Sequence, residues 1–150
     1  MFFCFSKPSF KKIDMALLEK HLLVKTSSLP KAGKGLFTKV PIPKGKMIVE
    51  YKGKVTAWKD VNDDNGRNRY IYYINKHIVI DAKDNVKALA RYANDSKGPH
   101  RREGIKNNSM YAIEHDRVFI KATKNIPAGA EILVGYGKNY WDVLRENKVV

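Results

Sequence analysis

The 150-residue chain is poor in several features on which whole classes of protein depend. It has one cysteine, Cys4, which can form neither an intramolecular disulfide nor a cysteine-based zinc cluster, and this favours a reducing compartment. No apolar run approaches the roughly 18 residues that a membrane-spanning helix needs, and Lys7 and Pro8 interrupt the apolar start before a signal-peptide core could form. We therefore expect a soluble intracellular protein, of the cytoplasm, nucleus or nucleoid, without a structural metal.

Acidic residues are also scarce, because 15 Asp and Glu face 29 Lys and Arg and leave a net charge of +14. Such a surface attracts nucleic acid and acidic proteins. The basic residues are nevertheless scattered in small clusters at 11–12, 44–46 and 100–102, and no common nucleic-acid-binding motif is present. The favoured interpretation is a solvated basic surface, and non-specific contact with nucleic acid through that surface is the alternative.

Several catalytic signatures are missing as well. The sequence has no G-x-S-x-G, P-loop or H-E-x-x-H motif, and Gly33-Lys34-Gly35 is too short for a dinucleotide-binding fingerprint. The four histidines show no metal-ligand spacing, so we expect no metal site. These absences argue against phosphoryl transfer and hydride transfer.

The chain is long enough, and at 43% hydrophobic residues apolar enough, to fold around a single core. Short runs typical of strands are found at 47–51, 69–74, 77–81, 110–113, 118–122 and 132–134. Asn75-Lys76 is expected to form the hairpin turn between two of them, and helices are expected only at 12–25 and 85–93, the latter capped by Asp84. The prediction is a mainly β protein with few short helices.

Two segments of the chain resemble each other. Residues 38–51 and 123–136 both pass from a Pro-x-Gly turn into an apolar strand that ends at a tyrosine, which predicts two similar arms within one β-rich domain. Two polar stretches, 60–68 and 97–107, are expected to be long loops, and such loops in a compact domain are commonly functional.

Aromatic residues are plentiful, with eight tyrosines and two tryptophans, and Tyr136, Tyr140 and Trp141 crowd together after an apolar strand. Core packing is the ordinary role of such residues. The functional alternative is a pocket for a cation, because aromatic faces attract ammonium and sulfonium groups.

Four segments in order resemble the SET domain, a family of protein-lysine methyltransferases that use S-adenosylmethionine. The segments are Gly33-Lys34-Gly35-Leu36-Phe37, the stretch 42–53 ending in Glu50-Tyr51-Lys52-Gly53, the stretch 80–96 ending in Arg91-Tyr92-Ala93-Asn94-Asp95-Ser96, and 126–137. The resemblance covers 23–141 and leaves 1–22 as an extension and 142–150 as a tail. It implies a β-clip of small curved sheets with a knot-like crossing, in which 91–96 passes next to 131–137.

The resemblance also implies roles for individual residues. Tyr136 matches the catalytic tyrosine. Three residues match substrate-binding positions of the lysine channel: Tyr51, Tyr111 and Val134. Nine match cofactor-binding positions: Lys34, Gly35, Leu36, Arg91, Tyr92, Asn94, Asp95, Tyr140 and Trp141. Asn94 is expected to accept a hydrogen bond from the cofactor's ammonium, while Arg91 has a structural alternative, an ion pair with Glu131.

Two departures from the family pattern bear on function. Asp95 stands where the family has a histidine, and no cysteine-rich lid follows Trp141, which leaves Tyr140 and Trp141 to cover the cofactor. The resemblance implies a lysine methyltransferase acting on a histone, a histone-like protein or another basic protein. A SET-like binding module without catalysis and a basic chromatin or nucleic-acid accessory protein are the alternatives. A monomer and a homodimer are both open.

The expected chemistry requires a neutral lysine, although the reference pKa of lysine is about 10.4. An apolar channel and a nearby sulfonium both lower that pKa. The resemblance also implies that two channel positions, matched by Tyr111 and Val134, limit the number of methyl groups. Tyr111 has a hydroxyl and Val134 has none, so mono- or dimethyl-lysine is expected as the main product. Acidic residues at Asp60, Asp63 and Asp64 are expected to face a basic substrate.

Overall fold

The computed structural model describes residues 17–99 and 101–137. Over these residues the chain forms three antiparallel sheets of three strands each, joined by 3-10 helices of one turn. The first sheet has the order β1 (Leu22–Thr26), β2 (Lys34–Thr38), β9 (Glu131–Ile132). The second has the order β3 (Met47–Glu50), β8 (Arg117–Ala122), β7 (Ser109–Glu114). The third has the order β4 (Lys54–Thr56), β6 (Ile78–Asp81), β5 (Ile71–Asn75).

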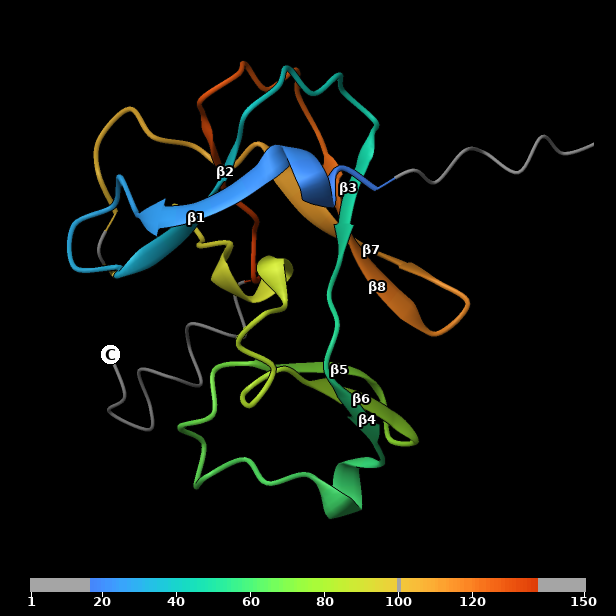
Figure 1. The fold of residues 1–150 in the computed structure, drawn as a ribbon. Coiled ribbons are helices and arrows are strands. Elements are labelled where there is room, and N and C mark those ends of the chain that lie inside the picture. Colours follow the sequence, from blue (N-terminus) through green and yellow to red (C-terminus); the bar gives the residue numbers. More distant parts are fainter. Residues whose placement is uncertain (1–16, 100, 138–150) are drawn as a thin grey trace, which may run out of the picture.

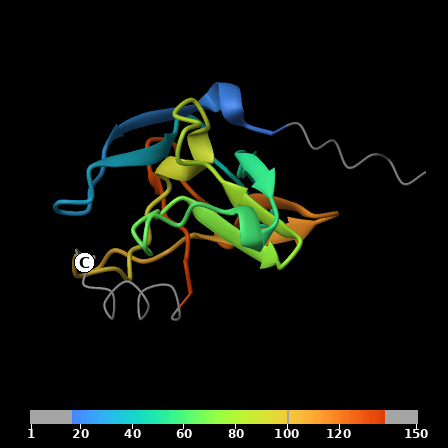
Figure 2. The same ribbon diagram turned by 90° about the horizontal axis from the view of Figure 1, so that it is seen from below.

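The three helices are η1 (Glu19–His21), η2 (Trp58–Asp60) and η3 (Leu89–Tyr92). In Figure 1 the third sheet lies below the other two, and η3 lies between them near the centre of the molecule. Seen from below in Figure 2, the third sheet is the part nearest the viewer. The element η3 packs against β1, β2 and β3, so it joins the first two sheets.

The middle strand of each sheet carries the buried apolar run. In β2 the run is Gly35 to Thr38, in β8 it is Val118 to Ile120, and in β6 it is the pair Val79 and Ile80. A strand with neighbours on both edges and elements on both faces is buried on both sides, so apolar residues follow one another without alternation. These strands form the core together with β3 and with Ile126 and Ile132.

The two similar arms pair with each other. Ile42 and Ile126 exchange two backbone hydrogen bonds, both N···O 2.8 Å. Each arm closes its Pro-x-Gly turn in the same way, with Gly45 at φ +88° and Gly129 at φ +85°, the left-handed backbone that a type II turn requires of its third residue. The prediction of two similar arms in one β-rich domain is confirmed.

Six strands match the predicted runs to within a few residues, which confirms the mainly β fold. The hairpin between β5 and β6 turns at Lys76 and His77, one residue later than predicted, because Asn75 still pairs with Ile78. Three strands, β1, β2 and β4, were not predicted. Lys, Thr and Gly are among the few residues of β1 and β2. These two segments are strands because they pair with each other, and β2 also pairs with β9.

Both helix predictions need correction. Of the expected helix at 12–25, residues 12–16 lie outside the described part, and the remainder is one 3-10 turn followed by β1. The expected helix at 85–93 is shortened to η3, and Ala88, not Asp84, precedes its first residue. Its apolar spacing reflects burial of Ala90 and Ala93 against the first two sheets, and not an α-helix. No helix of the described part is long and apolar enough to span a bilayer.

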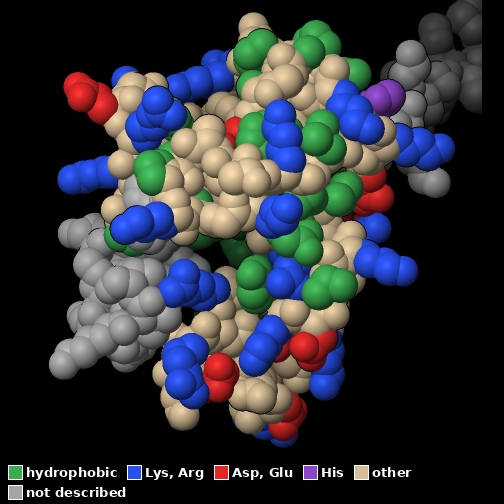
Figure 3. Space-filling model, turned by 60° about the vertical axis from the view of Figure 1, so that its left-hand side comes forward, with side chains coloured by type: hydrophobic (Ala, Val, Ile, Leu, Met, Phe, Trp, Pro, Cys, Tyr) green, Lys and Arg blue, Asp and Glu red, His purple; other side chains and the backbone are tan. Residues whose placement is uncertain are grey.

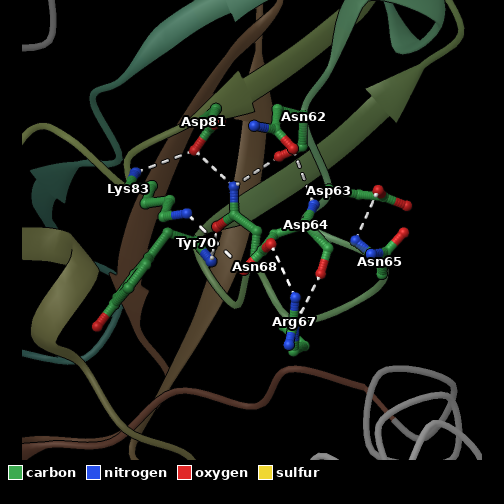
Figure 4. Close-up of polar contacts among 9 residues, drawn as sticks. All are labelled: Asn62, Asp63, Asp64, Asn65, Arg67, Asn68, Tyr70, Asp81 and Lys83. Atoms are coloured by element: carbon green, nitrogen blue, oxygen red, sulfur yellow. Dashed lines mark hydrogen bonds and ion pairs between the residues drawn. The ribbon is translucent and has the colours of Figure 1, made fainter.

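The loop 60–68 is ordered by its own polar side chains (Figure 4). Asn62 and Asp63 accept backbone N–H groups two residues later, and Asn68 donates to the Asp81 carboxylate at 3.1 Å. Arg67 binds Asp64 at 3.2 Å. Asx turns of this kind give a long loop a fixed shape without apolar burial.

Candidate active site

A cleft of about 940 Å³ opens between the first and third sheets. One side comes from the loop before β2, including Leu29, and from Lys34 at the start of β2, and the other comes from Arg69 and strand β5. The remaining walls come from η3 and the residues after it, from β7, and from the segment 135–137. The cleft is therefore built from parts of the chain that are far apart in sequence.

Four tyrosines form an aromatic wall in this cleft: Tyr51, Tyr72, Tyr111 and Tyr136. The ring centroids of Tyr72 and Tyr111 are 4.9 Å apart, and Tyr111 stacks on Tyr136 at 6.3 Å with 22° between the planes. Tyr51 meets Tyr72 and Tyr111 at 6.1 Å each. Such a wall is apolar in body and has negative ring faces, so it suits a long alkyl chain that ends in a cation or amine.

The hydroxyls of this wall are tied into the fold or kept neutral. The Tyr51 hydroxyl donates to the backbone oxygen of Tyr70 at 2.9 Å. Burial raises the pKa of the Tyr72 phenol above its ordinary value, because a phenolate would lose its hydration there. Tyr72 therefore presents a neutral hydroxyl at any ordinary pH.

Tyr136 is fixed at two points by one short segment. Its hydroxyl donates to the carbonyl oxygen of Ala93, and its backbone N–H donates to Asp95 Oδ2 at 2.9 Å. Between these contacts, the N–H of Val134 donates to the carbonyl oxygen of Asn94 at 2.9 Å. The segments 93–96 and 133–136 thus lie side by side and parallel, with an isolated bridge at Asn94–Leu133, and a second parallel bridge joins Val134 to Ser109 at the start of β7.

This contact is extended by Asn108. Its side chain donates to the Glu131 carbonyl at 2.9 Å and accepts the N–H of Leu133 at 3.0 Å. We call residues 93–96, 107–109 and 131–136 together the junction. The junction agrees with the neighbouring passage of two segments that the sequence led us to expect, while a knot-like threading stays a prediction.

The polar edge of the cleft is organised by Glu131, which is 7% exposed. Its carboxylate accepts the Ser27 hydroxyl at 2.7 Å and the Ser28 N–H at 2.9 Å. A Cβ on Gly35 would lie 2.3 Å from Glu131 Oε1, so glycine at this position makes room for the carboxylate. Asn94 adds a hydrogen bond from its amide to the backbone oxygen of Lys34 at 2.9 Å, which joins the junction to the start of β2.

Arg91 does not pair with Glu131, which corrects the structural alternative considered for it. Its Nη1 donates to the carbonyl oxygens of Ala82 at 2.9 Å and Lys83 at 2.7 Å, and its guanidinium lies 3.9 Å from the centroid of the Tyr70 ring. Glu131 is instead occupied by the two serines and Asn94. The Nε of Arg91 is buried and has no hydrogen-bond partner.

The structure brings many of the expected site residues to one cleft. Those that line it are Lys34, Tyr51, Arg91, Tyr92, Asn94, Asp95, Tyr111 and Tyr136. Gly35, Leu36 and Val134 do not line it; all three are buried, and the side chains of Leu36 and Val134 belong to the core. Tyr140 and Trp141 lie outside the described residues. As binding residues, all of these stay predictions.

Sequence reasoning missed Tyr72, the residue most closely packed against Tyr111. The signal available was period-two alternation in β5, which puts Tyr72 on the opposite face from Tyr73. It could not say which of the two side chains meets Tyr111. Only the pairing of β5 with β6 and the position of β7 decide that.

The charges around the cleft are mostly positive. Lys31, Lys34, Arg69 and Arg91 line it, against the single carboxylate of Asp95. None of the acidic residues expected to face a basic substrate lines the cleft: Asp64 pairs with Arg67 and Lys83, and Asp63 caps its own loop. Lys and Arg side chains are spread over the whole face shown in Figure 3, with fewer Asp and Glu among them.

Comparison with known proteins identifies the family. Residues 33–137 match the SET domain family. The variant-silencing SET domain-containing protein of Plasmodium falciparum is 30% identical over 148 residues, which is 91% of this chain and 5% of that protein. The N-lysine methyltransferase KMT5A-A of Danio rerio is 28% identical over 116 residues, 70% of this chain and 32% of that protein. The chain thus spans a small part of the curated relatives that it matches.

Two solved structures support the fold. The methyltransferase domain of human PR domain-containing protein 2 has a TM-score of 0.55 and 25% identity, covering 78% of this chain and 77% of that chain. A humanized mutant of the Polycomb Repressive Complex 2 of Chaetomium thermophilum, bound to the inhibitor GSK126, has a TM-score of 0.63 and 25% identity, covering 83% of this chain and 16% of that chain.

Proposed function

The chain belongs to the SET-domain family, and we propose that it is a protein-lysine N-methyltransferase that uses S-adenosylmethionine. The observation that carries the proposal is Tyr136, which stands at the meeting of an aromatic wall and a polar edge and is fixed at its hydroxyl and its backbone N–H. Two lysine methyltransferases among the relatives support the reaction class: the Danio rerio protein, and the histone-lysine N-methyltransferase EZH2 of Chaetomium thermophilum, 28% identical over 81% of this chain and 8% of that protein.

The residues of the cleft fit S-adenosylmethionine. Aromatic faces suit its sulfonium, and Lys34, Arg91 and Asn94 at the polar edge offer donors and acceptors for its amino-acid end. The unsatisfied Nε of Arg91 is a donor that a bound acceptor would satisfy. The bound cofactor would supply an electrophilic methyl group to the lysine.

The chain's own residues would prepare the lysine. The tyrosine wall excludes water and stabilises the neutral amine over the ammonium, and the four cations around the cleft act in the same direction. The neutral phenol of Tyr72 adds no negative charge that would retain the proton. Tyr136 would then orient the amine, and such positioning provides most of the rate when the nucleophile needs no strong base.

The decisive test is Tyr136→Phe, with transfer of labelled methyl to histones and other basic proteins as the readout. We expect a fall of at least about 10-fold in kcat, since positioning groups are worth factors of this order and more. Calorimetry should show cofactor affinity within about twofold of the unmutated protein. A variant with the unmutated rate would make Tyr136 structural. No transfer from the unmutated protein, with cofactor still bound, would favour the binding-module alternative.

The extent of methylation would depend on Tyr111. Its ring stacks on Tyr136, so its hydroxyl belongs to the same wall as the reacting amine. A hydroxyl that holds the amine or a water restricts the room for a further methyl group. We expect mono- or dimethyl-lysine from the unmutated protein and a shift toward higher methylation in Tyr111→Phe. Mass spectrometry that finds mainly trimethyl-lysine without any mutation would contradict this role.

A polyanion partner is supported by a second concavity, on the loop 97–107. Five cations line it, Lys97, Arg101, Arg102, Lys106 and Lys124, against one carboxylate, Glu103. None of the five forms an ion pair with another described residue. A basic enzyme that binds nucleic acid here would meet basic proteins that are themselves bound to the same nucleic acid.

This partner is tested by the salt dependence of DNA binding. Replacing Arg101 and Arg102 by serine should weaken DNA binding. It should also make the slope of log affinity against log salt less steep, because fewer phosphate contacts release fewer counterions when the DNA binds. The matched control replaces Lys54 and Lys59, exposed cations around η2, by serine. Equal losses from the two pairs would mean that the whole surface binds DNA without a preferred site.

A further inference from the structure

Asp95 lies where three segments of the chain meet, and it is 5% exposed. Its Oδ2 accepts the backbone N–H of Tyr136 at 2.9 Å. Its Oδ1 accepts the N–H of Lys97 at 2.9 Å and the side-chain amide of Asn107 at 2.8 Å. One buried carboxylate thus binds the backbone of Tyr136 and both ends of the loop 97–107.

Asn107 completes the arrangement. Its oxygen accepts the N–H of Ser96 at 2.9 Å, while its amide donates to Asp95. The pair therefore closes the loop 97–107 at its base with hydrogen bonds in both directions. The same loop contributes Gly98 and Pro99 to the wall of the cleft. The position of that wall and the position of Tyr136 consequently depend on one side chain.

The donor pattern calls for a carboxylate. Three donors converge on Asp95, and an ionised carboxylate is an acceptor on both oxygens. An asparagine would turn its NH₂ group toward at least one of these donors. A neutral histidine, the residue expected here from the family pattern, has one acceptor nitrogen. The chain thus departs from the family at the position where its own contacts need two acceptor atoms.

We propose that Asp95 is a positioning residue for the proposed methyl transfer, which fixes the backbone of Tyr136 relative to the loop 97–107. Ala93 holds the Tyr136 hydroxyl and Asp95 holds its N–H. If the bond from Asp95 to the Tyr136 N–H is lost, the backbone of Tyr136 can shift while its hydroxyl stays bound to Ala93. The ring then tilts, and the hydroxyl points in another direction. A misplacement of about 1 Å in a positioning group can cost about 100-fold in rate.

The test compares Asp95→Asn with the double variant Asp95→Asn, Asn107→Asp. The single variant sets the new NH₂ group either against the Tyr136 N–H or against the donors of Lys97 and Asn107, so residue 95 shifts and its bond to the Tyr136 N–H is weakened or lost. We expect kcat to fall at least about 10-fold, with KM for the peptide changed less than about threefold. In the double variant the new amide donates to the new carboxylate at 107 and its oxygen still accepts the Tyr136 N–H. We expect the double variant to recover at least about threefold of the lost kcat. Asp64→Asn, an exposed carboxylate of the loop 60–68, is the matched control and should leave kcat unchanged.

A second readout needs no activity. Hydrogen exchange of the Tyr136 amide should be faster in Asp95→Asn and slow again in the double variant, because that amide is directly bound by the residue at 95. If the unmutated protein transfers no methyl, this measurement still decides the structural part of the inference. If Asp95→Asn does not fold, Asn107→Ala removes one of the three donors and should give a smaller change of the same kind. An unchanged kcat with an unchanged amide, or no recovery in a folded double variant, would overturn the proposal.

Discussion

The loop of the third sheet and the junction use polar side chains in opposite ways. In the loop 60–68, most hydrogen bonds join residues two to six apart, and the side chains of Asp64 and Arg67 are 42% and 61% exposed. At the junction, hydrogen bonds join residues up to 104 apart, and Asp95 and Glu131 are buried. Local bonds close short loops at little entropic cost, whereas distant bonds specify which segments meet. The junction therefore fixes the site, whereas the loop fixes its own shape and its attachment to the end of β6.

The largest difference in the free energy of unfolding is expected between an apolar residue of the junction and one of the third sheet. Ile132 in β9 is fully buried, and Val55 in β4 is 64% exposed. Ile132→Ala should lower the free energy of unfolding by about 2–5 kcal/mol, because it removes transfer energy and leaves a cavity. Val55→Ala should change it by less than about 0.5 kcal/mol. Chemical denaturation measures both, and similar losses would remove the distinction between the regions.

The buried carboxylate of the junction comes next. Glu131→Gln sets an amide NH₂ against the donors of Ser27 and Ser28, so we expect a loss of about 1–3 kcal/mol in unfolding free energy. Asp64→Asn, in the exposed loop, should cost less than about 1 kcal/mol, as surface ion pairs do. An equal cost at the two positions would show that burial and sequence separation do not decide the worth of these carboxylates.

A smaller effect is expected at the outer face of the third sheet. Trp58 and Tyr73 are 47% and 53% exposed, and their rings meet edge to face at 5.5 Å. Trp58→Ala should cost about 1 kcal/mol, the size of an aromatic pair plus the area that it covers. Methyl transfer should change little, because Trp58 itself does not line the cleft, although its ring partner Tyr73 does. A loss of activity larger than the loss of stability would show that the third sheet transmits strain to the site.

The smallest effect on stability is expected from an ion pair whose partners are distant in the sequence but exposed to solvent. Glu50 and Arg117 join β3 to β8 across 67 residues by two hydrogen bonds of 2.7 Å, and the Arg117 side chain is 56% exposed. The hydrogen bond from Arg117 lowers the pKa of Glu50 below its ordinary 4.5. The pair therefore adds stability above that pH, and the contribution is lost as the pH falls through the lower pKa of the folded state.

Because solvent screens this pair, we expect a contribution below about 1 kcal/mol. Glu50→Gln should remove it at pH 7 and have a smaller effect on the stability at pH 3. Unfolding curves at the two pH values make the comparison. A larger effect at pH 3 than at pH 7 would contradict the direction of the shift.

Much of the fold was readable from local patterns. The runs that became β3, β5, β6, β7 and β8 are rich in β-branched and aromatic residues, and these types are enriched in strands. The paired Pro-x-Gly turns were visible because a left-handed position selects glycine. Strand β2 was not readable, because it begins with Lys34 and Gly35, which disfavour strands, and it depends on pairing with β1 and β9.

The candidate site likewise has features that could be predicted from the sequence and features that depend on tertiary contacts. The sequence by itself was enough to predict the family, to single out Tyr136 as a site residue and to name most of the residues around it. These predictions depend only on the order and spacing of residues along the chain. Only the tertiary structure decided that Tyr72 joins the wall, that Arg91 binds carbonyls in place of Glu131, and that Asp95 anchors Tyr136. These contacts join residues from eight to 41 positions apart in the sequence, and a hydrogen bond or ring contact depends on the position of both partners in space. No local pattern carries that information.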